Sequence, residues 1–408
     1  MHKLWRIQGA GGHGKSHTLR AFIAKATSMG KRVIVCATTA KASKLLGDGA
    51  CTVHMAFGFT GPSWIPLTNP NILMYIDLAD VIVIDEVSMA KADLLQEVHQ
   101  RCIDASPNST EPFAGKFVIL GGDKHQLPAV CDRRCNEASC IHQPYRWAMW
   151  PHFREIVLQK NYRQHADSIS WISCLNKIRV SVPGDAELAL LQTRVAGNEW
   201  VAPKNAVFLA GTNEEVAKFN EEAAHAHFPE ANLVTILAED EVERSNRFST
   251  QDLTYLKRIM EDKGVLPEKL LLAPGMVVMC TQNLKYPNID NGTLAEVVAI
   301  ETTHIHIRVL GTNCEVNIPH IIDSKYHNRI RLKRKMYPLV VAFARTVHKV
   351  QGDTIRDPVV IDFTNMSRLG QAYVALSRIV SIDQLHILPR GITLTSDMFQ
   401  PHVPDDGD

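Results

Sequence analysis

Features that would assign this sequence to a specialised class of protein are scarce. No apolar run is long enough to span a bilayer, and repeats and low-complexity tracts do not stand out. The net charge is only +1, so any surface that binds nucleic acid must be a local one. These absences argue against a helical membrane protein, a repeat protein and a uniformly basic protein, and they leave an ordinary globular chain.

Cysteine usage and length narrow the class further. The nine cysteines are odd in number and scattered along 408 residues, which favours a reducing compartment over a disulfide framework. Because the first motif begins as early as Gly9, we expect no signal peptide. We therefore expect a soluble intracellular protein of the nucleus or cytoplasm, not a secreted one, with two or more domains.

A glycine-rich stretch near the start, GAGGHGKS at 9–16, fits the phosphate-loop pattern G-x-x-x-x-G-K-[ST]. The preceding LWRIQ is typical of a short strand, and the following residues have helical spacing, with Leu19, Phe22 and Ile23 on one side. An ordinary glycine-rich turn would not need this context. We therefore expect a nucleoside triphosphate with Mg²⁺ here, with Lys15 reaching the β- and γ-phosphates and Ser16 holding the metal.

Three further strands are expected: one lies within 32–40, one begins at Val81 and one begins at Lys116. Each of them ends in small or polar residues. Alternation of strands with helical segments predicts a parallel sheet with its site at the carboxyl ends of the strands. Asp85 is then expected to hold Mg²⁺, Glu86 to activate the attacking water, and Gln126 to contact the γ-phosphate and that water. The alternatives are a solvated strand end and an ordinary loop glutamine. The residues expected to bind the nucleotide are Gly9, Gly11, Gly12, Gly14, Lys15, Ser16, His17, Asp85 and Gly352, with Ser16 and Asp85 as the magnesium ligands.

Four later stretches, taken with these motifs, resemble superfamily-one helicases of the Pif-one type, which are related to RecD. They are LQKNYRQ, APGMVVMCTQNL with NGTLAEV, PLVVAFARTVHKVQGDTI and GQAYVALSR, and they follow the family's order over nearly the whole chain. The resemblance implies an α/β fold of two RecA-like P-loop NTPase domains with parallel sheets and a small β-barrel insert in the second. We place the first domain at 1–160 with a short pin insert near 59–78, and the second at 161–408 with the barrel near 290–336.

The resemblance also implies an activity: an ATP-dependent DNA helicase that moves 5′→3′ on single-stranded DNA and serves DNA replication, repair or recombination. Arg163 and Arg378 resemble two arginines that reach ATP from the second domain, where a rigid guanidinium fork can neutralise charge during phosphoryl transfer. We expect Arg378 at the end of an amphipathic helix. The expected catalytic residues are Lys15, Glu86, Gln126, Arg163 and Arg378.

A DNA-binding set follows from the same motifs. Single-strand binding needs donors along the backbone and aromatic rings on which bases stack. The expected DNA contacts are Thr38, His54, Phe57, Thr346, His348 and Lys349. For Phe57 and Phe59, packing in the core is an equal alternative. In NRIRLKRKMYP, four cations at 329, 331, 333 and 335 share one face of an expected strand and could follow phosphates, or could instead protect a charged edge strand.

Departures from the family pattern leave alternatives open. The chain begins eight residues before Gly9, without the upstream element that recognises adenine in the family, so either the start is truncated or base selectivity is weak. The expected pin is short, which keeps open an ATP-gated single-strand binding or remodelling factor that does not unwind robustly, and a viral-type RNA helicase.

A zinc site at Cys131, Cys135, Cys140 and His142 has atypical spacing and is left out of the metal assignment. The expected partners are single-stranded DNA and tailed duplex DNA, with no membrane, and we expect a monomer on DNA.

Overall fold

The computed structural model describes residues 2–59, 69–130, 140–165, 168–203, 205–243, 250–262, 266–287, 289–312, 314–328 and 330–403. The chain forms two compact units. The first joins Met1–Trp200 to Val350–Asp408, and the second is Val201–Lys349. The chain therefore leaves the first unit, builds the second, and returns to complete the first.

A six-stranded parallel sheet is the centre of the first unit, in the order β3-β2-β4-β5-β1-β6. Its strands are β1 (Leu4–Gln8), β2 (Val33–Ala37), β3 (Cys51–Thr52), β4 (Val81–Asp85), β5 (Phe117–Gly122) and β6 (Arg154–Val157). The four strands expected from the sequence correspond to β1, β2, β4 and β5. Strands β2, β4 and β5 are apolar along most of their length because both faces of the sheet are covered, whereas β1 also carries Arg6 and Gln8.

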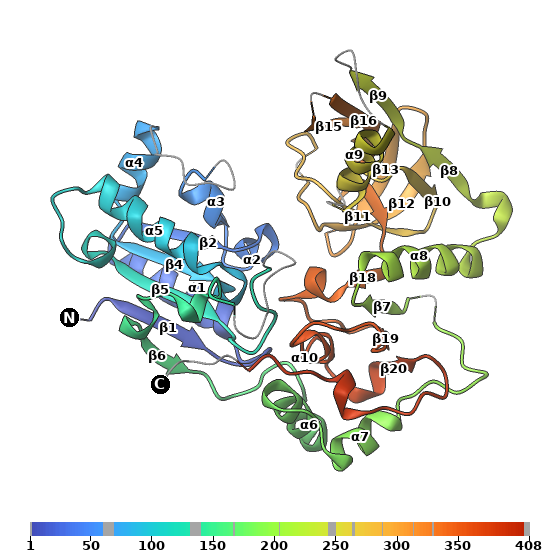
Figure 1. The fold of residues 1–408 in the computed structure, drawn as a ribbon, viewed down its shortest axis with the longest axis horizontal. Helices are drawn as coiled ribbons and strands as arrows, with labels where there is room; N and C mark the ends of the chain where they lie inside the picture. Colours follow the sequence, from blue (N-terminus) through green and yellow to red (C-terminus); the bar gives the residue numbers. More distant parts are fainter. Residues whose placement is uncertain are drawn as a thin grey trace. The chain divides into compact units, whose positions relative to one another are not determined.

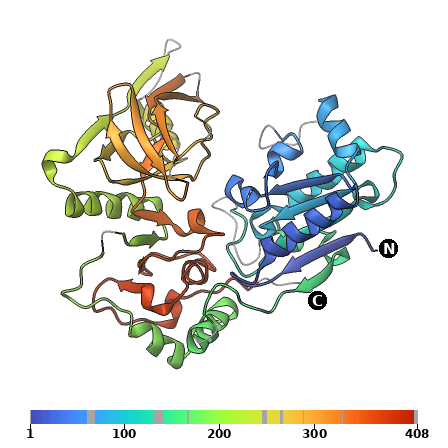
Figure 2. The ribbon, with the colours of Figure 1, turned by 180° about the vertical axis from the view of Figure 1, so that it is seen from behind.

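Alternate residues of each strand enter separate cores on the two faces. Ile82 and Ile84 of β4 pack with α5 (Ala92–Ala105), whereas Val81 and Val83 pack with α1 (Lys15–Ser28). Helix α5 lies on the side of the sheet that faces the reader in Figure 1, and α1 lies on the side seen in Figure 2. The expected apolar side of α1, made by Leu19, Phe22 and Ile23, is confirmed as its packing face.

The remaining elements of the first unit are short. Helices α2 (Ala40–Lys44), α3 (Val53–Ala56) and α4 (Pro70–Asp77) connect the strands of the sheet. Later come α6 (Ile169–Val180), α7 (Asp185–Gln192), α10 (Gln371–Leu376) and the parallel pair β19 (Val359–Asp362) and β20 (Leu385–Leu388). These later segments carry side chains to the phosphate loop, as described below.

The second unit combines a parallel pair with antiparallel sheets. Strands β7 (Val207–Ala210) and β18 (Ala344–Thr346) run parallel, and α8 (Asn213–His227) packs on both. The antiparallel part has a pair, β8 (Val234–Leu237) with β10 (Lys269–Leu272); a five-stranded sheet, β14-β13-β12-β11-β17; and a three-stranded sheet, β15-β16-β9. The strands of these two sheets are β9 (Glu239–Glu243), β11 (Val277–Cys280), β12 (Leu294–Ile300), β13 (His304–Val309), β14 (Glu315–Pro319), β15 (Ile321–His327), β16 (Ile330–Met336) and β17 (Leu339–Val341).

Three expectations for this half of the chain can be compared with the structure. The strands expected near 290–336 are present, but among the described residues they form the two antiparallel sheets above and no closed barrel. The polar composition of 239–270 predicts an irregular segment, but it contains β9, helix α9 (Thr250–Asp262) and the start of β10. The compact units do not divide at residue 160, since 161–200 and 350–408 belong with the first; the domain boundary itself stays a prediction.

The sequence left two interpretations of the row of cations in the second unit: a surface that follows phosphates, or a charged edge strand. The structure fits neither of them. Arg331, Lys333 and Lys335 do share one face of β16, while Arg329 lies outside the described residues. However, β16 is the central strand of its sheet, so it is not an edge strand. Its neighbour β9 is acidic, and Glu239 and Glu243 form ion pairs with this row. The cations are therefore neutralised within the sheet instead of being displayed to a partner.

Arg334 of β16 points to the opposite face of the sheet from this row and is fully buried. The Arg334 guanidinium, 0% exposed, donates from Nε and Nη2 to the two carboxylate oxygens of Asp240 at 2.7 and 2.8 Å. Removing one partner of a buried pair leaves an uncompensated charge. We expect Arg334→Met to destabilise the second unit by about 3 kcal/mol, whereas Lys335→Met, which breaks an exposed pair, should cost less than about 1 kcal/mol.

Urea unfolding followed by two probes checks this prediction. All six tryptophans lie outside 201–349, so tryptophan fluorescence follows the first unit and circular dichroism follows both. An earlier dichroism transition for Arg334→Met, with the fluorescence transition unchanged, is the expected result. Equal stability of the two variants would contradict the role given to the buried pair.

Candidate active site

The phosphate loop connects the end of β1 to the start of α1. Gly12 and Gly14 have φ of +86° and +80°, a region in which a side chain is strained. A Cβ on Gly12 would lie 2.5 Å from Cβ of Arg163, and one on Gly11 would lie 2.9 Å from Nη2 of Arg378. Glycine is therefore required here both for the turn and for the close approach of two arginines.

Lys15 and Ser16 begin α1 and face the ends of β1 and β4. The buried Lys15 ammonium donates to the carbonyl oxygens of Gly9 and Ala10 at 2.7 and 3.2 Å. Burial lowers the pKa of Lys15, while Asp123 and Glu86 act in the opposite direction. Ser16 donates through Oγ to Oδ2 of Asp85 at 2.8 Å. A hydroxyl beside a carboxylate is an oxygen donor set of the kind that Mg²⁺ accepts, so these two residues fit the expected ion.

Glu86 follows β4 in a strained backbone conformation, with φ 54° and ψ 40°. Its N–H donates to Oδ1 of Asp85 at 2.8 Å, and its carbonyl oxygen accepts from Oγ1 of Thr38 at 3.0 Å. Its carboxylate accepts from Nε2 of Gln351 at 3.1 Å. Burial, and then the nearby charge of Asp85, raise the pKa of Glu86. Strain held by several surrounding bonds is a feature of functional positions.

Two arginines from later segments of the chain, Arg163 and Arg378, lie against the phosphate loop. Arg163 donates from Nε to Oγ1 of Thr354 at 2.9 Å and from Nη1 to the carbonyl oxygen of Ser377 at 2.7 Å. Burial, and then the neighbouring charge of Arg378, lower the pKa of Arg163 to about 9. Arg378 is 1% exposed, and its Nη2 donates to Oγ of Ser377 at 2.7 Å. The expectation of an amphipathic helix before Arg378 is wrong, because α10 is buried on every side.

These groups line one cavity of about 280 Å³ in the first unit. Gln126 also lines it, is 2% exposed, and its Oε1 has no hydrogen-bond partner among the described residues. A buried acceptor without a partner is costly unless a ligand or water satisfies it. Of the residues expected to bind the nucleotide, the cavity is lined by Gly11, Gly12, Gly14, Lys15, Ser16, His17, Asp85 and Gly352. Gly9 lies outside the lining, and its role is to accept the Lys15 bond.

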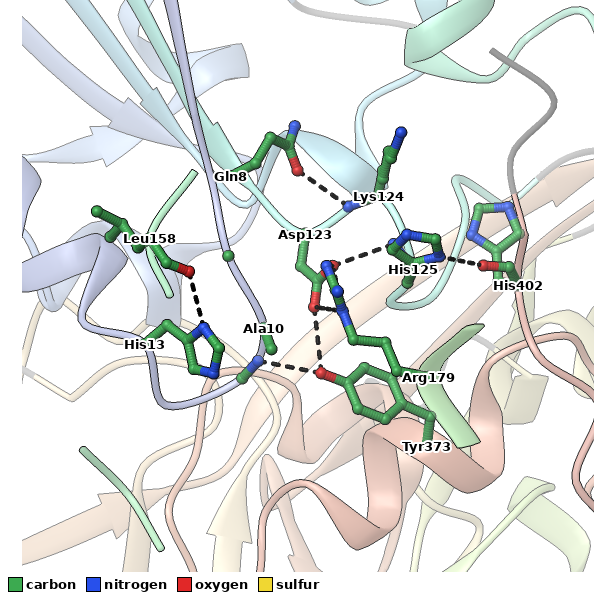
Figure 3. A network of polar contacts seen from close by, with 12 residues as sticks. Gln8, Ala10, His13, Asp123, Lys124, His125, Leu158, Arg179, Tyr373 and His402 are labelled. Atoms are coloured by element: carbon green, nitrogen blue, oxygen red, sulfur yellow. Dashed lines mark hydrogen bonds and ion pairs between the residues drawn. The ribbon is translucent and has the colours of Figure 1, made fainter. Parts of the chain in front are cut away.

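A second layer of residues behind the loop was not expected from the sequence. Figure 3 shows the Tyr373 hydroxyl pointing at Asp123, whose carboxylate also meets Arg179. Asp123 stands in the GGDKHQ stretch already associated with the site, and Tyr373 stands in QAYVALSR, so both had a motif signal. Arg179 had none, because it is one charged residue near the end of the ordinary helix α6. Gln351 was likewise missed, although it adjoins the expected Gly352.

Among the expected DNA contacts in the first unit, Thr38 is half-buried and His54 is exposed on α3. The expectation for Phe57 needs correction, because its ring is 0% exposed and packs in the core under β2 and β4. A base cannot stack on a ring that has no free face. Phe59 is partly buried, stacks on Phe57, and has the Arg101 guanidinium over its ring at 5.3 Å.

The expected contacts in the second unit occupy one short segment. Thr346 ends β18 and is 7% exposed, while His348 and Lys349 lie in the 3₁₀ turn that follows, with Lys349 exposed. Their role in binding DNA stays a prediction.

Two further expectations concern metals and membranes. Of the zinc candidates, Cys131 and Cys135 lie outside the described residues, and the remaining described residues hold no cluster of three metal-ligating side chains. His142 instead contacts Asp93. Within the described ranges, no helix is long and apolar enough to cross a membrane.

Comparisons with known proteins can now be set beside this geometry. A family model described as PIF1-like helicase matches residues 2–174. The chain is 27% identical over 397 residues to ATP-dependent DNA helicase Pif1 of Bdellovibrio bacteriovorus, covering 95% of this chain and 85% of that protein. It is 26% identical to ATP-dependent DNA helicase PIF1 of Danio rerio, covering 96% of this chain but 60% of that protein.

Solved structures of Pif1 helicases have a similar fold. Bacteroides Pif1 bound to single-stranded DNA matches with a TM-score of 0.76 at 22% identity, covering 97% of this chain and 90% of that one. A structure of two coordinating Pif1 helicases at forked duplex DNA matches with a TM-score of 0.76 at 23% identity, covering 98% and 90%. This likeness confirms the predicted α/β fold class of RecA-like domains with parallel sheets.

The crowding at Gly12 leads to a prediction. We expect Gly12→Ala to lower the affinity for ATP by about tenfold or more, because the new methyl group meets Arg163 and the backbone is strained, at about 1–3 kcal/mol for strain alone. Gly30→Ala is the matched control, since Gly30 has a similar φ of +76° but nothing within 4 Å of an added Cβ. Titration with a fluorescent ATP analogue measures both. Equal affinities in the two variants would show that the Arg163 contact has no importance for binding.

Proposed function

We propose that this chain is a PIF1-like helicase, an ATP-dependent DNA helicase that moves 5′→3′ along single-stranded DNA. The relatives it matches are named ATP-dependent DNA helicases, and one similar solved structure holds ADP-AlF3 and single-stranded DNA. Hydrolysis of ATP would drive strand movement and the unwinding of tailed duplex DNA.

The observation that carries the proposal is the set of charges around one cavity. Lys15 and the Ser16–Asp85 pair lie at the start of α1, and the half-buried Arg163 and the buried Arg378 lie against Gly11. Phosphoryl transfer needs positioning and neutralisation of charge more than covalent chemistry. A cavity with this many fixed donors suits a nucleoside triphosphate whose terminal phosphate is being transferred.

Each side chain receives a role from its position. Mg²⁺, when bound, would neutralise charge on the phosphates, and Ser16 and Asp85 would hold it. Glu86 would accept the proton of the attacking water, since its raised pKa makes it a better base than an exposed glutamate. The orphaned Oε1 of Gln126 would orient that water, while its Nε2 and the two arginines would donate to the γ-phosphate. Lys15 would turn from the loop carbonyls to the phosphates.

The hydrogen bond between Thr38 and Glu86 gives a physical route from DNA to hydrolysis. Thr38 holds the carbonyl oxygen of the strained Glu86. A strand bound at Thr38 and at the exposed His54 would therefore act on the backbone of the proposed base. Thr346, His348 and Lys349 are the proposed contacts from the second unit, and both sets are rich in donors suited to phosphates.

Two finer expectations belong with the proposal. We expect a monomer on DNA, although one similar structure contains two coordinating helicases; mass photometry on a tailed duplex would decide between them. We also expect the protein to work inside the cell, in the nucleus or cytoplasm, as a DNA-acting enzyme does.

The first test is steady-state ATPase activity with and without single-stranded DNA. We expect DNA to stimulate the wild-type enzyme, and Glu86→Gln to lower kcat by about 10²-fold or more, because an amide cannot accept a proton. Glu97→Gln is the control, since Glu97 is a partly buried carboxylate on α5 that does not line the cavity.

Duplex substrates then separate the proposal from its alternatives. Unwinding of a 5′-tailed but not a 3′-tailed duplex supports the proposed polarity. ATPase activity stimulated by DNA without any unwinding would instead favour an ATP-gated binding or remodelling factor. Stronger stimulation by RNA than by DNA of the same sequence would favour an RNA helicase.

The environment of Glu86 also predicts a pH dependence. Only the deprotonated carboxylate can accept a proton, so kcat should fall as the pH is lowered, with a midpoint above the ordinary glutamate value of 4.5. Gln351→Leu removes a hydrogen bond that favours the charged form, so it should move that midpoint upward. A pH profile of kcat at saturating ATP measures both. A midpoint that does not respond to Gln351→Leu would argue against Glu86 as the base.

A further inference from the structure

The Tyr373 hydroxyl makes two hydrogen bonds behind the phosphate loop. Its oxygen accepts from the backbone N–H of Gly11 at 3.1 Å and donates to Oδ2 of Asp123 at 3.2 Å. A phenol can serve as donor and acceptor at once. Tyr373 lies on α10 and is 2% exposed. Neither Tyr373 nor Asp123 lines the cavity, so neither is placed to touch a nucleotide in it.

The partner of this hydroxyl is itself held firmly. Asp123 is 0% exposed and accepts from Nη2 of Arg179 at 2.8 Å and from the N–H of His125 at 3.2 Å (Figure 3). Burial raises the pKa of Asp123, but the charges of Arg179 and Lys15 outweigh it and keep the pKa below its usual value. The carbonyl oxygen of Asp123 also accepts from the N–H of Gln126. An ionised, well-anchored carboxylate therefore orients the hydroxyl.

Gly11 is the point at which the two arginines meet the loop. A Cβ built on it would lie 2.9 Å from Nη2 of Arg378 and 3.2 Å from Nη1 of Arg163. Arg378 follows α10 directly after its cap, Ser377. The Tyr373–Gly11 bond thus ties the segment that carries Arg378 to the part of the loop against which Arg378 lies.

We propose that Tyr373 is a positioning residue of the ATPase site, whose hydroxyl holds α10 on Gly11 so that Arg378 meets the phosphate loop at a set distance. Asp123 and Arg179 orient the hydroxyl, and through the carbonyl oxygen of Asp123 the same link reaches Gln126. This inference rests on the proposed function. It adds a residue that acts through Arg378 and Gln126 without contacting the substrate.

The hydrogen bond between Tyr373 and Gly11 should affect the chemical step more than the binding of ATP. Without the hydroxyl, the buried Gly11 N–H loses its acceptor and Arg378 loses its fixed placement. The lysine, serine and glycine contacts of the loop are unchanged. An interaction needed mainly in the transition state lowers kcat while KM stays nearly constant.

Tyr373→Phe tests this, because the change removes one oxygen and keeps the ring. We expect kcat for DNA-stimulated ATP hydrolysis to fall by about tenfold, with KM for ATP within about twofold of the wild type. The matched control is Tyr337→Phe. Tyr337 is also 2% exposed and its hydroxyl reaches the carbonyl oxygens of Glu301 and Thr302, but it lies in the second unit. Thermal melting of both variants separates a loss of stability from a loss of positioning.

The outcomes are distinct. An active wild type with an unchanged kcat for Tyr373→Phe, or with an equal loss for Tyr337→Phe, would overturn the inference alone. A wild type without any ATPase activity would overturn the proposed function and this inference with it.

A double-mutant cycle with Arg378→Lys tests the route of action. If Tyr373 acts through Arg378, Tyr373→Phe should have a much smaller effect on kcat in the Arg378→Lys background than in the wild type. Fully additive effects on kcat would mean that the two residues act independently, and would overturn the inference.

Discussion

Buried charge is the constraint on which the rest of the first unit depends. Lys15, Asp85, Asp123 and Arg378 are each exposed by no more than 8%. An ionised side chain removed from water is costly unless another charge or several hydrogen bonds compensate it. The compensation comes from segments far apart in the chain: the ends of β1, β4 and β5, helix α6 and the α10 segment. Burial of these charges is therefore tolerated only because late residues of the chain pair with them.

The same bonds that satisfy these charges also connect the functions proposed for them. Glu86 keeps its strained backbone because Asp85, Thr38 and Gln351 hold its amide, carbonyl and carboxylate groups. Strain of this kind persists only where neighbours over-determine the conformation. Any change that reaches Thr38 or Gln351 is therefore felt at the proposed base. Behind the loop, the Tyr373–Asp123–Arg179 group has the same proposed role for Arg378, the arginine expected to meet the phosphates.

In the second unit, charged side chains are paired between neighbouring strands instead of being buried around a cavity. The cations of β16 face an acidic neighbour, β9, and the pairing of the two strands aligns Lys333 with Glu241 and Lys335 with Glu239. Opposite charges across a strand pair stabilise that pairing modestly. A basic row in a sequence is therefore not evidence for a nucleic-acid surface until its neighbours in the sheet are known. The exposed Lys349 after β18 is the better candidate, because it follows a strand end within a motif.

The sequence by itself determined four strands of the parallel sheet (β1, β2, β4 and β5), the phosphate loop and the placement of Asp85 and Glu86 at a strand end. These depend on local spacing: apolar runs, glycines before a helix, and polar residues where a strand stops. Tertiary structure alone decided three other matters. Phe57 is in the core, β16 lies between β15 and the acidic β9, and Arg179 and Gln351 join the site. Each of these depends on which distant segment packs alongside, and local periodicity carries no information about that. For a buried charge or a ring, the partner across the fold decides what the side chain can do.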